Sequence, residues 1–365
     1  MRTNNPDNER IKHRYFAYLR EAKRLSEASI DGVAAALHRF EAYTGHREFK
    51  AFHYQQAVAF KRHLADQVSQ RSGERLSKAT LYSTLTALRN FFFWLAGQPG
   101  FRSRLTYSDA DYFNISDKDA RIAKARREPR KPTLDHLRHA LARMSVTTEI
   151  ERRDRAVFAF VLLTGTRDGA VVSLKLKHVD LTENKVTFDA RDVRTKFAKT
   201  FDTWFFPVGN DVRQVVVDWV EYLLHEKRFG PDDPLFPATE VALNADQQFA
   251  AVGLSRRHWS NATPVRTIFR EAFIRADLPY FNPHSVRNTL VGLGQKLCRT
   301  PEQFKAWSQN LGHEKVLTTF SAYGEVSGAR QSEIIRDLAE APDPNECELQ
   351  ELAQELVKAA RRAAT

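Results

Sequence analysis

Cationic side chains stand at two places in the second half of the chain where a helix is expected to end or begin. The run 164–167, Thr-Gly-Thr-Arg, puts Arg167 directly after an apolar segment that a glycine ends. His284 and Arg287 have the i, i+3 spacing that puts two side chains on one helix face, in the first turn after Asn282. Helix N-termini attract anions because their amides are unpaired and the macrodipole is positive there. These patterns predict an anion site.

A third pattern adds a histidine and a candidate nucleophile. Leu311, Gly312 and His313 follow a short expected helix, and Tyr323 comes ten residues after the histidine. Each pattern alone is weak, because a chain with 12 histidines and this much arginine contains roughly one His-x-x-Arg by chance. A tyrosine in an amphipathic segment usually packs in a core with its hydroxyl at the surface. The evidence therefore lies in the joint occurrence and the order of the patterns.

Taken together and in this order, the patterns resemble the tyrosine recombinase family, over about residues 10–330. The catalytic domain of that family carries an arginine in a Thr-Gly-x-Arg motif, a lysine in its sheet, a His-x-x-Arg motif, a Leu-Gly-His motif and a nucleophilic tyrosine. The residues that match these positions are Arg167, Lys196, His284, Arg287, His313 and Tyr323. The resemblance implies strand cleavage and rejoining through a 3′-phosphotyrosyl intermediate on Tyr323.

The chemistry of phosphodiester cleavage fits these residue types. A tyrosine has a pKa near 10 and needs help to lose its proton. By the resemblance, His284 would act as proton acceptor or donor beside the tyrosine. Charge gathers on the nonbridging oxygens, and the two planar guanidinium groups suit it, while His313 would hydrogen-bond the phosphate. The departing 5′ oxygen needs a proton, and a lysine on a β-turn can deliver it. Lys196 is the preferred donor, with Lys199 as its competitor.

Two features depart from the family pattern. The family often has an acidic residue three positions after the first arginine, whereas this chain has Ala170, with Asp168 as the only nearby substitute. The interval from His313 to Tyr323 is also one residue longer than is commonest in the family. A loop before the tyrosine can absorb the extra residue, so the first departure is the more serious one.

Composition supports a polyanionic partner. The chain has 56 basic and 45 acidic residues, a net charge of +11, which favours nucleic acid. We expect the partners to be double-stranded DNA with a specific site and, by the resemblance, a homo-tetramer assembled on two such sites. No cofactor is expected: the sequence offers no carboxylate cluster for a metal and no phosphate-binding loop for ATP.

The elements predict a mainly α fold with a small β-sheet, made of an N-terminal helical core-binding bundle and a mixed α/β catalytic domain. Apolar residues three and four apart predict four amphipathic helices in residues 1–100. A basic linker follows at 101–131, and residues 118–138 carry a charge of +5. The catalytic domain is expected at 132–335, and the tail 336–365, which is acidic over 337–356, is a candidate docking helix between protomers.

Within the catalytic domain, 185–189 and 201–208 are aromatic and β-branched, which predicts two short strands. Residues 238–262 have no clear period and are expected to form a loop or a lid. Polar residues followed by proline predict three helix starts, with Thr263, Asn282 and Thr300 as N-caps.

The chain has no apolar run long enough for a membrane span and no signal-like start, so a cytoplasmic, nucleoid-associated protein is expected. Two other functions remain open at this point. A type IB topoisomerase shares much of the active-site chemistry but works as a monomer and needs no synapsis. A DNA-binding protein whose catalytic activity has decayed is the second alternative, and Ala170 is the feature in its favour.

Overall fold

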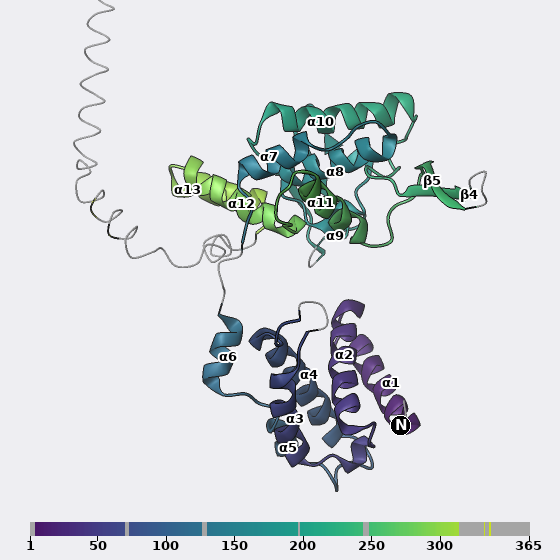
Figure 1. The fold of residues 1–365 in the computed structure, drawn as a ribbon, viewed down its shortest axis with the longest axis vertical. Coiled ribbons are helices and arrows are strands. Elements are labelled where there is room, and N and C mark those ends of the chain that lie inside the picture. Colours follow the sequence, from purple (N-terminus) through teal and green to yellow (C-terminus); the bar gives the residue numbers. More distant parts are fainter. Residues whose placement is uncertain are drawn as a thin grey trace, which may run out of the picture. The chain divides into compact units, whose positions relative to one another are not determined.

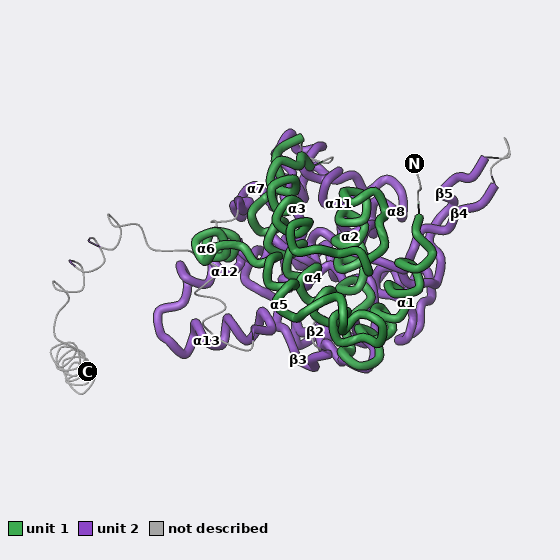
Figure 2. The backbone as a smooth tube through the Cα atoms, turned by 90° about the horizontal axis from the view of Figure 1, so that it is seen from below, with its two compact units in different colours: residues 1–126 green, residues 127–365 purple. Residues whose placement is uncertain are grey.

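The computed structural model describes residues 4–69, 73–125, 130–195, 198–243 and 248–313, together with Ser332 and Arg336. The chain divides into two compact units, residues 1–126 and 127–365 (Figure 2), and each has a hydrophobic core of its own. In the part of the chain that is described, no helix has both the length and the apolar character needed to cross a membrane.

The first unit is a bundle of helices (Figure 1). Its elements are α1 (Pro6–Glu21), α2 (Glu27–Thr44), the 3-10 turn η1 (Phe49–Ala51), α3 (Tyr54–Asp66), α4 (Lys78–Ala96), α5 (Tyr107–Asp111) and α6 (Asp117–Lys124). The four predicted apolar stripes correspond to α1 to α4. Phenylalanine rings fill the core, where Phe52 stacks on Phe92 with centroids 3.9 Å apart. Gly45, with a φ of 64°, ends α2 in the left-handed conformation that favours glycine.

The first unit extends further than the predicted bundle. Phe101, Leu105, Ala110 and Phe113 are buried in its core, so the chain after residue 100 continues the fold as α5 and α6. The boundary between the units falls at 126/127, inside the stretch predicted as a linker. These apolar residues are spaced too irregularly to form a helical stripe, which is why the basic charge of the later residues dominated the prediction.

The second unit is mainly helical and contains two small sheets (Figure 1). Its helices are α7 (Leu134–Ala142), α8 (Glu149–Thr164), α9 (Asp168–Val171), α10 (Asn210–Glu221), α11 (Thr263–Arg275), α12 (Pro283–Leu297) and α13 (Pro301–Asn310), with the 3-10 turn η2 (Leu176–His178) and the π-helical turn η4 (Tyr222–Glu226). Helix α8 packs against α7, α10, α11 and α12, and every residue from Ala156 to Thr164 is buried. This central helix gives the site below a rigid base.

An antiparallel sheet packs beside the end of α8. It consists of β1 (Val179–Asp180), β2 (Lys185–Phe188) and β3 (Phe201–Trp204), in the order β1-β2-β3, with Phe188 paired to Phe201. The two predicted strands are β2 and β3. The second strand ends at Trp204, earlier than predicted, because Phe206 turns into the core and its N–H donates to the carbonyl of Leu163 at 2.7 Å.

Residues 238–262, predicted as a loop or lid, contain a β-hairpin instead. Its strands are β4 (Thr239–Leu243) and β5 (Phe249–Leu254), with a bulge between Glu240 and Val241. Most of the hairpin side chains are exposed, with Phe249 at 81%. A strand without a buried face does not need to alternate apolar and polar residues. The two-residue period that identifies strands is therefore missing from this segment.

Candidate active site

Arg167 is positioned by the turn that ends α8. Gly165 adopts a φ of 64°, and a Cβ there would meet Leu311 at 2.9 Å and Leu290 at 3.0 Å, so the position needs glycine for both its backbone and its space. The buried hydroxyls of Thr164 and Thr166 lie 2.6 Å apart and stabilise the turn. The arginine that follows is therefore held against the rigid end of a buried helix.

Arg287 joins three segments of the second unit. Asn282 caps α12 by accepting from the N–H of Ser285 at 3.1 Å, and Arg287 lies one turn further on, only 4% exposed. Its Nη1 donates to the carbonyl of Gly165 at 2.5 Å. Its Nη2 donates to the carbonyl of Leu311 at 2.5 Å and lies 3.0 Å from Nε2 of His313. One guanidinium thus connects the end of α8, the start of α12 and the end of α13.

His313 follows α13 through a tight turn. Gly312 has a φ of 67°, and a Cβ there would meet the ring of Phe201 at 2.8 Å. Burial, followed by the charges of Arg287 and Arg167, lowers the pKa of His313 to about 4. The imidazole is therefore neutral at neutral pH, and its Nε2 accepts the hydrogen bond from Arg287. His284 and Lys199 also lower the pKa of His313, so their charges act on the same place.

Both arginines line one pocket, together with Ala170, Arg194 and Thr195. Burial and the charge of Arg167 lower the pKa of Arg287 to about 9, which still leaves it protonated at neutral pH. Burial also lowers the pKa of Arg167. In the described part of the chain, no carboxylate forms an ion pair with either guanidinium. Two close, partly desolvated cations without a counter-ion favour an anionic ligand.

The position where the family often has an acid is filled by a methyl group. Ala170 is 5% exposed and lines the pocket. Asp168 does not substitute for the missing acid, because its Oδ2 accepts from Nε of Arg266 at 2.7 Å. Arg167 is therefore placed by the backbone turn at Gly165 and not by a carboxylate.

The remaining predicted residues are described in part. His284 is exposed in the first turn of α12, on the same helix as the buried Arg287. Lys196 and Tyr323 lie outside the described residues. Arg194 and Thr195 line the pocket but were not predicted as site residues. Their only signal in the sequence was their place next to Lys196.

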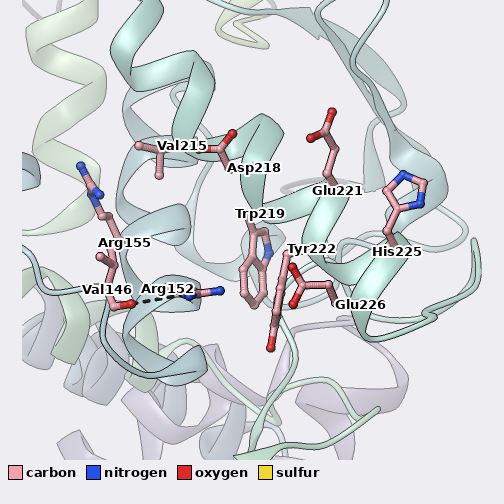
Figure 3. Close-up of a pocket in the computed structure, with 10 residues that line it drawn as sticks. All are labelled: Val146, Arg152, Arg155, Val215, Asp218, Trp219, Glu221, Tyr222, His225 and Glu226. Carbon is pink, nitrogen blue, oxygen red and sulfur yellow. Dashed lines mark hydrogen bonds between the residues drawn. The ribbon is translucent and has the colours of Figure 1, made fainter.

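A second pocket lies at the other end of α8, between α8 and α10 (Figure 3). Its walls carry charges of both signs, from Arg152, Arg155, Asp218, Glu221 and Glu226. None of the predicted catalytic residues that are described lines it. The mixture of charges distinguishes this pocket from the cationic pocket at Arg167 and Arg287.

Comparisons with known proteins agree with the geometry. The model of the phage integrase family matches residues 121–330. Tyrosine recombinase XerC of Stutzerimonas stutzeri is 22% identical over 308 residues, which cover 84% of this chain and 88% of the relative. Tyrosine recombinase XerC of Salmonella typhi is 24% identical over 308 residues, with the same coverage of both chains.

Solved structures share the fold. A lambda integrase dimer bound to a COC′ core site aligns with a TM-score of 0.58 and 11% identity, covering 88% of this chain and 96% of that one. XerH recombinase in its post-cleavage complex with palindromic difH aligns with a TM-score of 0.58 and 16% identity, covering 89% and 84%. The predicted fold class, mainly α with small sheets, is confirmed.

Because the family model spans more than half of the sequence, the chain belongs to the phage integrase family. It is a tyrosine recombinase, an enzyme of site-specific DNA recombination. The family predicted from the ordered motifs is confirmed. The relatives are recombinases, so the topoisomerase and the decayed DNA-binding protein are not favoured.

Proposed function

We propose that the cationic pocket is the catalytic site of this recombinase and that it holds the phosphate that is cleaved. The observation that supports this most strongly is the convergence of Arg167, Arg287 and His313 from three separate segments, without a carboxylate partner for either arginine among the described residues. A pentacoordinate phosphorane carries more negative charge on its nonbridging oxygens than the ground state does. Fixed cations therefore stabilise the pentacoordinate phosphorane more than they stabilise the ground state.

The reaction proceeds by two transesterifications. The phenol oxygen of Tyr323 attacks the phosphorus, the bond to the 5′ oxygen breaks, and a 3′-phosphotyrosyl ester forms. His284 accepts the phenol proton, and Lys196 gives a proton to the departing 5′ oxygen. In the second step, a 5′ hydroxyl of the partner strand attacks the phosphotyrosine and releases Tyr323. One phosphoester bond is exchanged for another in each step, so no ATP is consumed.

The two arginines and His313 stabilise the transition state. Arg287 lines the pocket and is fixed by two carbonyl groups, so its charge needs no reorganisation when the phosphate binds. Arg167 lies across the same pocket and approaches the phosphate from another side. His313, neutral and bonded to Arg287, hydrogen-bonds a nonbridging oxygen.

The partners that we propose are those of the family. The substrate is duplex DNA with a recombination site, and four protomers assemble on two sites so that strands are exchanged in pairs. The dimeric lambda integrase complex supports the binding of more than one protomer to a site. The helical first unit and the basic residues 118–138 bind the phosphate backbone of the duplex. The enzyme works on the nucleoid, and the acidic tail, which lies outside the described residues, docks on a neighbouring protomer.

The test is covalent capture. A pool of nicked suicide duplexes, prepared from DNA that flanks the gene, is incubated with the protein and then denatured in detergent. We expect a protein–DNA adduct with the wild type and no adduct with Tyr323→Phe, whose affinity for the duplex stays nearly the same. An adduct formed by Tyr323→Phe would contradict the assignment of the nucleophile.

A supercoiled plasmid without a recombination site separates the remaining alternatives. A recombinase leaves such a plasmid supercoiled and joins two sites in synapsis. Relaxation of the plasmid by a monomer would instead support a topoisomerase. Binding without any adduct would support the decayed DNA-binding protein.

A further inference from the structure

Three buried side-chain polar atoms have no hydrogen-bond partner in the described part of the chain: Arg155 Nε, His178 Nε2 and Thr195 Oγ1. Arg155 lies in the mixed-charge pocket with Asp218 and Glu221 (Figure 3). His178 Nε2 is 3.6 Å from a carboxylate oxygen of Asp192. Only Thr195 lines the pocket that contains Arg167 and Arg287. A shielded, unbonded hydroxyl costs about 1–3 kcal/mol, so its presence beside two arginines that form no ion pair with a described residue calls for a ligand.

The chain that leads to Thr195 is anchored at several points. Asp192 forms ion pairs with Lys175 at 3.0 Å and with Lys177 at 2.8 Å. Val193 is 3% exposed in the core. The N–H of Arg194 donates to Ser173 Oγ at 2.8 Å. These anchors end one residue before Thr195, so its position at the pocket is fixed by tertiary contacts.

The side chain of Arg194 is already engaged. Its Nη1 donates to the carbonyl of Ser260 at 2.9 Å, which directs the guanidinium toward the segment after β5. Arg194 is an exposed residue, whereas the Thr195 hydroxyl is buried and has no hydrogen-bond partner among the described residues. This hydroxyl carries one proton to donate and can rotate to meet an acceptor.

We propose that the Thr195 hydroxyl donates a hydrogen bond to a nonbridging oxygen of the scissile phosphate. This inference rests on the proposed function of the pocket and adds a neutral donor to the two arginines. Thr195 would be a catalytic residue, because it touches the reacting phosphate.

The test compares Thr195→Val with Thr195→Ser. Valine keeps the shape and loses the hydroxyl, whereas serine keeps the hydroxyl. We expect cleavage of a suicide duplex to slow roughly tenfold to a hundredfold in Thr195→Val and to stay near the wild-type rate in Thr195→Ser. Thr200→Val is the matched control, since Thr200 Oγ1 belongs to the same β2–β3 connection but accepts from the N–H of Ala190 at 3.1 Å. Thermal melting checks that each variant is folded.

Two modified substrates identify the contact. A methylphosphonate replaces one nonbridging oxygen by a methyl group, so the penalty of Thr195→Val should disappear on one of the two diastereomers. A 5′-bridging sulfur leaves without a proton and therefore reports on the lysine. Rescue by the sulfur substrate alone would overturn the inference, because Thr195 would then act through Lys196. A wild-type rate for Thr195→Val, or a defect that neither substrate rescues, would overturn it too.

Failure of this inference and failure of the proposed function give different results. If the inference fails while Tyr323→Phe still abolishes the adduct, the catalytic site stands without Thr195. If Tyr323→Phe still forms the adduct, the proposed nucleophile is wrong, whatever the behaviour of Thr195→Val.

Discussion

The charged groups at the two ends of α8 differ in whether an opposite charge neutralises them. At the N-terminal end, Glu149 accepts from Lys227 at 2.8 Å, from the Tyr222 hydroxyl at 3.0 Å and from the N–H of Leu254 at 3.0 Å. Although burial opposes it, these bonds hold the pKa of Glu149 below its usual value. At the C-terminal end, Arg167 and Arg287 share a pocket without a carboxylate among the described residues.

This comparison distinguishes charged groups that stabilise the fold from charged groups that bind a ligand. A charge that is neutralised inside the protein contributes to stability and offers little to a substrate. Close, uncompensated cations weaken the unliganded fold and bind an anion more strongly. Substitutions at the two ends should therefore have separable effects on stability and on DNA cleavage.

The largest effect is expected for Arg287→Ala. This change removes a cation from the proposed phosphate site and leaves the carbonyls of Gly165 and Leu311 without their donor. We expect cleavage to fall at least about a thousandfold and the free energy of unfolding to fall by about 1–3 kcal/mol. Single-turnover cleavage and urea denaturation measure the two quantities. Loss of stability with cleavage intact would mean that Arg287 is only a structural residue.

Arg167→Ala should affect cleavage alone. We expect the cleavage rate to fall roughly a hundredfold to a thousandfold with little change in DNA affinity. Stability should stay the same or rise slightly, because burial and Arg287 both disfavour this guanidinium in the free protein. Equal losses in cleavage and affinity would reduce Arg167 to a phosphate-positioning residue.

Glu149→Ala is the matched substitution at the other end of the helix. Losing its bonds to Lys227, Tyr222 and the backbone should lower the free energy of unfolding by about 1–3 kcal/mol. The cleavage rate of the folded fraction should not change. A large drop in cleavage at unchanged stability would show that the two ends of α8 are not separate.

The smallest expected effect is a change in the free energy of unfolding with pH. The pKa of His313 is about 4 in the folded protein and near 6.5 when unfolded, so the unfolded state takes up the proton first. The free energy of unfolding should therefore fall as the pH is lowered from 6.5 toward 4, and this part of the fall should vanish in His313→Gln. Denaturation without DNA, at about pH 7 and about pH 5, measures it. His139→Gln, at an exposed position on α7, is the control, and identical slopes for wild type and His313→Gln would contradict the assignment.

Much of the site could be predicted because its signals are local. Gly165 ends α8, and Asn282 and Thr300 cap α12 and α13, as their residue types indicate. The third predicted helix start is shifted: α11 begins at Thr263 itself, and the N–H of Thr263 donates to the side chain of Asn261. Both Asn261 and Thr263 are residue types that cap helices, so the local pattern did not select one of them.

Features that depend on distant partners could not be predicted. Asp168 bonds to Arg266, 98 residues away, and nothing near Asp168 in the sequence reveals that choice. The pocket position of Thr195 depends on Ser173 and on the lysines of a separate segment. The hairpin at 239–254 buries too little surface to leave a period in the sequence. The family, in contrast, could be predicted from the order of the motifs, because phosphodiester cleavage requires these residue types.

The central claim is that Arg167 and Arg287 together neutralise a single phosphate. Cleavage of a methylphosphonate duplex tests it most directly, because this substrate carries no negative charge at the reacting phosphorus. We expect the rate loss caused by Arg167→Ala to shrink from at least about a hundredfold on the ordinary phosphodiester to less than about tenfold on the methylphosphonate. An undiminished loss on the uncharged substrate would contradict the claim.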